Sequence, residues 1–214
     1  MPIKPRPATS AVAAKTALTP KGQRTRQRIV AAAAELMLER GGAGTTVEDV
    51  QSAAGVSTSQ IYHYFADKQA LVRAVIEFQT DAVVGGQETM LAALDSLQGL
   101  RAWRDFIVGH QLRINCRGGC PLGSLGSELA ETDATARSDV AASFTRWEAG
   151  IRGGLRAMHA RGLLSPGASP DELALATLAA MQGGMLLSQI QRTTRPLEAA
   201  LDAMLTQIAG NSTP

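Results

Sequence analysis

From Lys21 onward, apolar residues recur at helical spacing, and glycine or proline separates each helical stretch from the next. No segment shows the alternation of apolar and polar residues that a half-buried strand requires. The composition agrees, because the sequence contains 36 alanines while aromatic residues make up only 4% of it. A β-sandwich or barrel would need more valine, isoleucine, tyrosine and phenylalanine. We therefore predict an all-α fold.

The chain can fill a core, and nothing in it points strongly to export or membrane insertion. Its 214 residues are 45% hydrophobic and 19% charged, which is enough for one large domain or two small ones. Two cysteines are too few for a disulfide scaffold, and no convincing signal peptide is present. We expect a cytoplasmic protein. The longest uncharged run, residues 173–191, is long enough to span a bilayer, but we predict an interface helix because it is interrupted by Gln182, Gly183, Gly184, Ser188 and Gln189.

Positive charge is concentrated at the N-terminal end of the sequence. The first 28 residues contain seven lysines and arginines and no acidic residue. Residues 1–79 hold ten basic and six acidic side chains, whereas residues 80–214 hold eleven and thirteen. A basic front on a nearly neutral body predicts a polyanionic partner for the N-terminal end.

Breaks in the helical pattern divide the chain into three predicted parts. Residues 1–20 are expected to form a flexible basic tail, residues 21–66 a domain of three helices, and residues 67–210 a larger helical domain. Pro121, Pro170 and Pro196 each stand where a helix is expected to begin. Within the larger part we place breaks near residues 85–86, 98–99, 117–120, 131–134, 162–170 and 193–196.

Residues 45–65 read TTVEDVQSAAGVSTSQIYHYF and predict two short helices joined by a tight turn. The spacing of Thr45 and Glu48 fits a capping box that starts the first helix, and Gly55 ends it after two turns. Ser57 can cap the second helix, and Ile61 helps to fill the gap between the two. The pattern is that of a helix-turn-helix, although a plain helical hairpin with a polar face has the same spacing.

The second helix of this pair is expected to expose hydroxyl, amide and aromatic groups. Such groups suit phosphate oxygens and base edges, and no carboxylate is present to repel DNA. Lys68 follows at the start of the next helix, where it is placed for a phosphate. The residues expected to be exposed are Ser57, Thr58, Ser59, Gln60, Tyr62, His63 and Tyr64.

The segment from Arg24 to about Val75 resembles the DNA-binding domain of TetR-family transcriptional regulators. The resemblance rests on Gly41, followed by Thr-Thr-Val-x-Asp-Val, Ala-Gly-Val-Ser, Ile-Tyr-x-Tyr-Phe and Asp-Lys-x-x-Leu. Gln51 departs from the family pattern, which has a small apolar residue there, and we expect it to be tolerated at the edge of the helix. The resemblance implies a repressor that binds a palindromic operator as a dimer and is released by a small molecule.

The resemblance also implies roles for residues of the N-terminal half. Thr45 and Thr46 would cap the second helix beside the DNA backbone, and residues 57–60 with His63 would face the major groove. The side chains expected to hold phosphates are Tyr62, Tyr64 and Lys68. Two roles stay open for the basic arm, which would either follow the minor groove or only solubilise the chain; its cationic residues are Lys15, Lys21, Arg24 and Arg26.

For residues 67–210 the resemblance implies effector binding and dimerisation. The helix ending at Gln191 is apolar nearly all round, so it must be covered on every side. Together with the last helix it would form a four-helix interface between two copies, to which we assign Leu175, Leu178, Leu186, Leu201 and Leu205. Side chains large or adaptable enough to line an effector pocket, each equally able to be plain core, are Trp103, Phe106, His110, Trp147, Met158, Met181 and Met185, with Gln111, Arg113 and Asn115 as polar anchors.

The segment Cys116-Arg-Gly-Gly-Cys120-Pro-Leu-Gly is similar to a Gly-Cys-Pro-x-Gly segment in a subgroup of the family that senses small, often aromatic or drug-like molecules. Cys120 is expected at the N-cap of a helix opened by Pro121, where the helix dipole, with Arg117 near, lowers the thiol pKa. Three roles stay open for it: a structural cysteine, a redox or electrophile sensor, or a metal ligand, for which a clustered histidine is lacking.

The sequence argues against an enzyme. Leu122-Gly-Ser-Leu-Gly lacks the first glycine and the preceding strand of a nucleophile elbow. There is no phosphate-binding loop or dinucleotide fingerprint, and the three histidines are scattered. We therefore expect no cofactor and no metal site. The alternatives to a ligand-released repressor are a thiol-based sensor that uses Cys120 and a DNA-binding dimer without a ligand.

Overall fold

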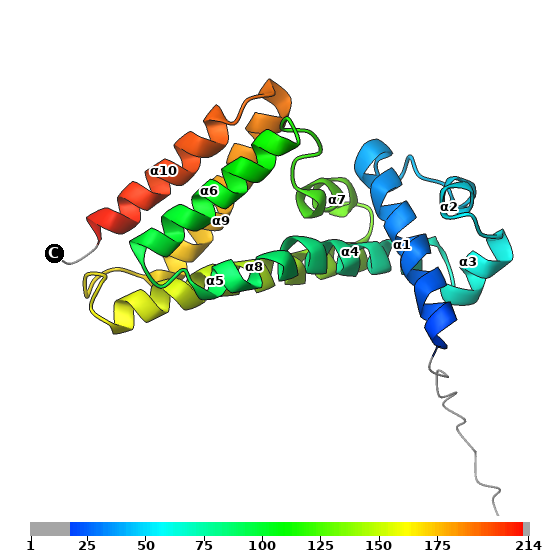
Figure 1. Cartoon of the computed structure of the whole chain (residues 1–214), viewed down its shortest axis with the longest axis horizontal. Helices are drawn as coiled ribbons and strands as arrows, with labels where there is room; N and C mark the ends of the chain where they lie inside the picture. The colour runs from blue at the N-terminus through cyan, green and yellow to red at the C-terminus, as the bar shows by residue number, and fades with distance from the viewer. Residues whose placement is uncertain (1–17, 212–214) are drawn as a thin grey trace, which may run out of the picture.

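The computed structural model describes residues 18–211, and all regular secondary structure in that range is helical (Figure 1). This confirms the all-α fold. The predicted tail, residues 1–20, lies outside the described residues except for its last three. Of these, Thr19 is already the N-cap of the first helix and Pro20 its first residue, so helix begins earlier than expected.

An N-terminal unit of three helices forms one end of the molecule (Figure 1). It consists of α1 (Pro20–Arg40), α2 (Val47–Ala54) and α3 (Thr58–Tyr64). Its core takes Val50 and Ala54 from α2, Ile61 from α3, and a stripe of α1 at helical spacing. Gly55 closes α2 in the left-handed conformation (φ 60°), which produces the tight turn into α3.

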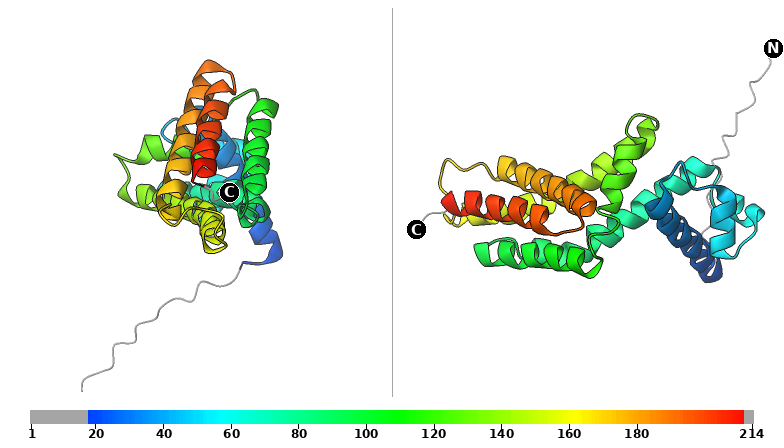
Figure 2. Two further views of the ribbon diagram at one scale, coloured as in Figure 1. Left: turned by 90° about the vertical axis from the view of Figure 1, so that its left-hand side faces the viewer. Right: turned by 90° about the horizontal axis from the view of Figure 1, so that it is seen from above.

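The fourth helix, α4 (Lys68–Val83), joins this unit to the rest of the chain. It packs against α1 on one side and against α8 on the other, and the molecule is elongated along these helices (Figures 1 and 2). The elements that follow are the 3-10 helix η1 (Gly85–Gln87), α5 (Glu88–Ala92), α6 (Leu97–Arg113), α7 (Pro121–Leu129), α8 (Ala134–Ala160), α9 (Pro170–Gln191) and α10 (Arg195–Gly210).

The predicted break at residues 98–99 is wrong, because α6 already begins at Leu97. Ser96 is its N-cap and accepts a hydrogen bond from the backbone N–H of Gly99. Gly99 lies so close to the carbonyl oxygen of Ala93 that a Cβ atom there would be only 1.9 Å from it. The glycine therefore marks a close approach of two backbone segments and not the end of a helix.

The start of α2 is also shifted by one residue from the prediction. The N-cap is Thr46, whose hydroxyl accepts from the Asp49 N–H at 3.1 Å, while the Asp49 carboxylate accepts from the Thr46 N–H at 2.9 Å. The capping box is thus Thr46–Asp49 and not Thr45–Glu48. The hydrogen bonds from Thr46 and the charge of Arg40 hold the pKa of the Asp49 carboxyl below its usual value.

The helix α9 is the one helix within residues 18–211 that is long and apolar enough to cross a bilayer. Length and composition alone do not separate such a span from an ordinary core helix. In the structure α9 packs between α8 and α10, and it buries one face there, including Leu173, Ala174 and Met181. The opposite face is exposed, as described below.

Candidate DNA interface and effector cavity

The outward face of α3 carries most of the side chains predicted for DNA contacts. Ser59, Tyr62 and His63 are exposed. Ser57 and Gln60 are exposed as well, but their side chains form the capping box of the helix: Ser57 Oγ accepts from the Gln60 N–H, and Gln60 Oε1 accepts from the Ser57 N–H at 2.9 Å. The face is polar and contains no carboxylate among these residues.

A hydrogen bond between Thr58 and Gln51 joins α2 and α3 at this face. The Thr58 hydroxyl donates a hydrogen bond to Gln51 Oε1. Gln51 is thus tolerated at the edge of its helix, as expected, and its side chain fixes the first turn of α3. The bond also engages the Thr58 hydroxyl within the protein.

Thr45 does not belong to the exposed set, so its predicted place beside DNA is wrong. Its side chain is 1% exposed, and its hydroxyl donates to the Gly41 carbonyl oxygen at 2.8 Å. Thr46, the actual N-cap, is exposed. Thr45 therefore stabilises the loop after α1 through its bond to Gly41, whereas Thr46 caps the exposed start of α2.

The predicted phosphate contacts and the basic arm are placed as follows. Tyr64 is half-buried and meets His63 edge to face, with 5.0 Å between ring centroids, and Lys68 is the first residue of α4. Lys15 lies outside the described residues. The other three cations of the arm belong to α1, so they do not form an extended arm; they are Lys21, Arg24 and Arg26. The Arg26 guanidinium lies over the Phe65 ring, 5.3 Å from its centroid.

A cavity of about 450 Å³ lies where the N-terminal unit meets the larger helical part. Its wall includes Leu38 from α1, Ala82 and Val83 from α4, and residues of η1, α6, α8 and α9. The volume is in the range of small-molecule sites. Five of the residues predicted to line a pocket are found there: Phe106, His110, Gln111, Trp147 and Met185.

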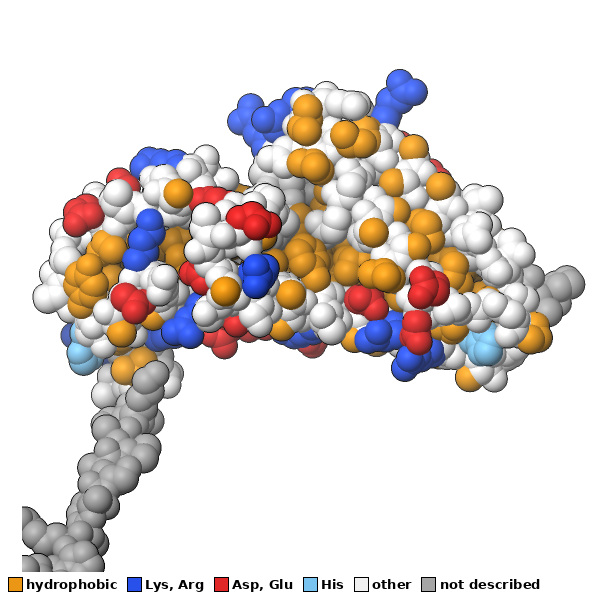
Figure 3. Space-filling model, turned by 180° about the vertical axis from the view of Figure 1, so that it is seen from behind, with side chains coloured by type: hydrophobic (Ala, Val, Ile, Leu, Met, Phe, Trp, Pro, Cys, Tyr) orange, Lys and Arg blue, Asp and Glu red, His pale blue; other side chains and the backbone are white. Residues whose placement is uncertain are grey.

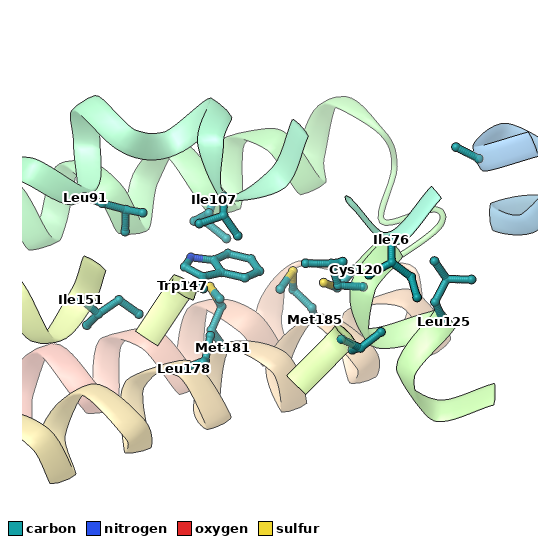
Figure 4. Packing of buried hydrophobic residues seen from close by; sticks show 14 of the residues in the cluster. Ile76, Leu91, Ile107, Cys120, Leu125, Trp147, Ile151, Leu178, Met181 and Met185 are labelled. Atoms are coloured by element: carbon teal, nitrogen blue, oxygen red, sulfur yellow. The ribbon is translucent and has the colours of Figure 1, made fainter. Parts of the chain in front are cut away.

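Five predicted pocket residues are not in the lining: Trp103, Arg113, Asn115, Met158 and Met181. Met158 is buried in the core, and Asn115 is exposed. Trp103 is buried and donates its indole N–H to Gln87 Oε1 at 2.8 Å. Met181 lies beneath the Trp147 ring and belongs to the core (Figure 4). Arg113 is exposed on α6. The sequence did not point to other lining residues, among them Leu38, Gln87, Ile107 and Ile114, because they share no motif.

Cys120 is the N-cap of α7, with Pro121 following, as predicted. Burial raises the pKa of its thiol above the ordinary value of 9.0, although the backbone N–H groups of Gly123 and Leu122 and the Gln182 side chain act in the opposite direction. The expectation of a lowered pKa is therefore wrong, because loss of water outweighs the helix N-terminus. Cys116 and Cys120 are both buried and free.

The exposed face of α9 is a stripe of apolar residues at helical spacing. Leu175, Ala179, Gly183, Leu186 and Ile190 recur every three or four residues, and Ile190 is 68% exposed. In the view from behind, hydrophobic side chains run across this part of the molecule (Figure 3). Such a contiguous apolar stripe marks an interaction surface.

Two of the leucines assigned to the dimer interface do not lie on that surface. Leu178 and Leu201 are buried within the subunit, between α9 and its neighbours, so they have little area left for a partner. Leu205 is half-buried. A helix that is apolar all round does not reveal from its sequence which face is internal.

A carboxylate on α7 contacts the loop between α1 and α2. Glu128 Oε2 accepts from the Gly42 N–H at 2.7 Å, and Oε1 accepts from the Ala43 N–H at 2.5 Å. We call this pair of bonds the Glu128 clamp. The first turn of the same helix, at Cys120 and Pro121, lines the cavity, so α7 reaches from the cavity to the N-terminal unit.

The loop between α6 and α7 holds the cavity wall against α1. Asn115, Cys116, Gly118 and Gly119 all have positive φ, and the Arg192 guanidinium donates to the Cys116 carbonyl oxygen at 3.0 Å. Gly118 lies against the Leu38 side chain. Asn115 and Cys116 adopt the left-handed conformation although neither is a glycine, which indicates that the surrounding contacts constrain this loop.

A three-helix unit with an exposed polar helix after a tight turn defines a helix-turn-helix DNA-binding protein. Two family models match the chain: bacterial regulatory proteins, tetR family, over residues 29–75, and the tetracyclin repressor-like C-terminal domain over residues 96–204. The chain belongs to the TetR family of transcriptional regulators.

Individual relatives agree. A TetR transcriptional regulator from Chloroflexus aurantiacus is 30% identical, with a TM-score of 0.77 over 91% of this chain and 98% of that one. The repressor DhaR of Mycobacterium sp. (strain GP1) is 27% identical over 82% of this chain and 88% of its own. The reduced form of Escherichia coli NemR is 26% identical, with a TM-score of 0.69 over 86% and 96% of the two chains.

Proposed function

We propose that this protein is a homodimeric repressor that binds a palindromic operator through α3 and is released by a small molecule in the cavity. The observation that carries the proposal is the composition of the cavity wall. Leu38 of α1 and Val83 of α4 line it together with residues of α6, α8 and α9. A ligand there touches the DNA-reading unit and the larger helical part at once.

Two contacts would transmit the effect of a ligand to the reading helices. The helix α4 packs against α1 and α8 and forms part of the cavity wall, so its displacement turns the N-terminal unit. The Glu128 clamp ties α7 to the loop that precedes α2. Because a dimer must fit two half-sites about one helical turn apart, a small change in the spacing of its two α3 helices lowers specific affinity.

The proposed dimer forms through the apolar stripe of α9 and the exposed side of α10. Leu175, Leu186 and Ile190 supply apolar area that no element covers within residues 18–211. A partner subunit that covers this face would also shield the apolar helix α9 from lipid. The proposal includes a cytoplasmic location and membership of the subgroup with the Gly-Cys-Pro-x-Gly segment.

The test is a fluorescence anisotropy titration against the intergenic DNA that flanks the gene. It is run with and without a panel of aromatic, cationic and thiol-reactive compounds. Saturable binding that one compound reverses supports the proposal. Binding that none of them reverses favours a DNA-binding dimer without a ligand, and a failure to bind any DNA contradicts the assignment of α3.

Lys68→Gln should weaken binding to every DNA sequence by a similar factor. If its ammonium holds one phosphate, the slope of log affinity against log salt concentration should become about one unit shallower, since one fewer counterion is released. Arg101→Gln removes the same charge from an exposed site on α6 and serves as the control. An identical slope for both variants would contradict the phosphate contact.

The alternative is a sensor that reacts through Cys120. Its support is the similarity to Escherichia coli NemR, which was solved in a reduced form. Burial and the raised thiol pKa argue against it. We expect iodoacetamide to label Cys120 in native Cys116→Ser protein at pH 7 at least tenfold more slowly than in urea. Labelling at equal rates, or loss in Cys120→Ser of the response to thiol-reactive compounds alone, would favour the sensor.

A further inference from the structure

We infer that the ligand of the cavity is an uncharged molecule with an apolar body that carries both a hydrogen-bond acceptor and a donor, as a carboxamide does. The inference rests on the proposed function, because it names the ligand class for the same cavity. It follows from the charges in the cavity wall, from two buried polar atoms, and from the difference between the two tryptophans.

The cavity wall offers no counter-charge for a cation. None of the lining residues within the described part of the chain is an aspartate or a glutamate. The ionisable groups are His110 and Arg117, which are both exposed, and the buried Cys120 thiol with its raised pKa. An ammonium group would lose its water without compensation, and a carboxylate would find its cations only at the exposed edge.

Trp147 and Trp103 form a natural comparison within the same core. The Trp103 indole N–H has its partner, Gln87 Oε1, at 2.8 Å. The Trp147 indole N–H has no partner among residues 18–211, although the side chain is only 1% exposed. In Figure 4 its ring lies between Ile107 and Met181 in an otherwise apolar setting. A buried donor without an acceptor is costly, and a ligand acceptor would relieve that cost.

Gln111 supplies the complementary group. Its side chain lines the cavity and is 2% exposed, and its Oε1 has no donor within the described residues. In the described part of the chain, its Nε2 donates only to the Met185 sulfur, at 3.7 Å. A thioether accepts a hydrogen bond but cannot donate one. The contact therefore turns Nε2 toward Met185 and leaves Oε1 facing away from it. The weak sulfur bond and the flexible Met185 side chain allow the amide to adjust to a ligand donor.

The experiment measures binding by titration calorimetry with four probes that share one ring and differ in the head group: benzamide, toluene, benzylamine and benzoate. The full chain is used at pH 7 without DNA. Benzamide should bind at least tenfold more tightly than the other three. Because no DNA is present, this result is independent of whether binding releases an operator, so failure of the proposed function is seen separately in the anisotropy titration.

Variants locate the binding groups. Trp147→Phe and Gln111→Leu should each lower the affinity for benzamide about tenfold and leave that for toluene unchanged, since each removes one hydrogen-bonding group. Trp103→Phe is the matched control, because it removes an indole whose N–H is already paired, and it should retain the preference for benzamide.

Four results would overturn the inference. The first is equal or tighter binding of toluene, the second is tightest binding of either charged probe, and the third is no binding of any probe at millimolar concentration. A preference for benzamide that survives in both Trp147→Phe and Gln111→Leu would also overturn it. Thermal unfolding of each variant without ligand checks that the fold is retained.

Discussion

Replacing Gly154 with alanine is expected to destabilise the protein by more than about 3 kcal/mol, a large part of the stability of a typical domain. A Cβ atom at this position of α8 would lie 2.5 Å from both the carbonyl oxygen and the Cβ of Leu94. The obstacle is mainly backbone, so no side-chain rotation can relieve it. The midpoint of urea unfolding should fall sharply, and the variant should be recovered in low yield.

Gly153 provides the control one residue away. It is on the same helix, is exposed, and has open space where a Cβ would be. Gly153→Ala should therefore leave stability unchanged or raise it by up to about 1 kcal/mol, through helix propensity. Equal unfolding midpoints for the two variants would mean that α8 and the segment around Leu94 are not in this close contact.

The second large effect is expected at the Glu128 clamp. Glu128→Ala removes the acceptor of both backbone N–H groups, so the loop before α2 is no longer tied to α7. The ratio of operator affinities without and with effector should fall at least fivefold towards one, within the usual range of allosteric coupling. Effector affinity measured without DNA should change little, since Glu128 is not in the cavity wall.

Two further variants make this result specific. Glu128→Gln keeps one acceptor oxygen without the charge and should retain part of the coupling, whereas Glu131→Ala removes a carboxylate from an exposed position nearby and should have no effect. Hydrogen exchange at the Gly42 and Ala43 amides should speed up in Glu128→Ala only. An unchanged affinity ratio would show that α4 alone carries the coupling.

The helices and the reading unit could be predicted from the sequence because they depend on local signals. Apolar spacing, a capping serine and Gly55 define α2 and α3 within twenty residues. The errors have local causes as well. Thr45 and Thr46 compete for the same cap, and only the bond from Thr45 to the Gly41 carbonyl decides which one faces outward.

The cavity and the clamp were beyond sequence reasoning because they depend on distant pairs. In the sequence, nothing distinguishes Leu38 from the other apolar residues of α1; in the structure, Gly118 packs against it. Glu128 has no motif around it, and its partners lie 86 and 85 residues away in the chain. The face of α9 that remains exposed is likewise set by where α8 and α10 pack, which the uniform apolar pattern does not specify.

The presence of Leu38 in the cavity wall bears on how modular this protein is. Joining the reading unit of one regulator to the sensing part of another is a natural way to build new switches. In this protein, such a chimaera would take α1 from one parent and the rest of the cavity wall from the other, so the part of the binding site formed by Leu38 would change. Retaining Leu38 and the α1 turn that faces Gly118 should be a condition for a hybrid that still responds to its inducer.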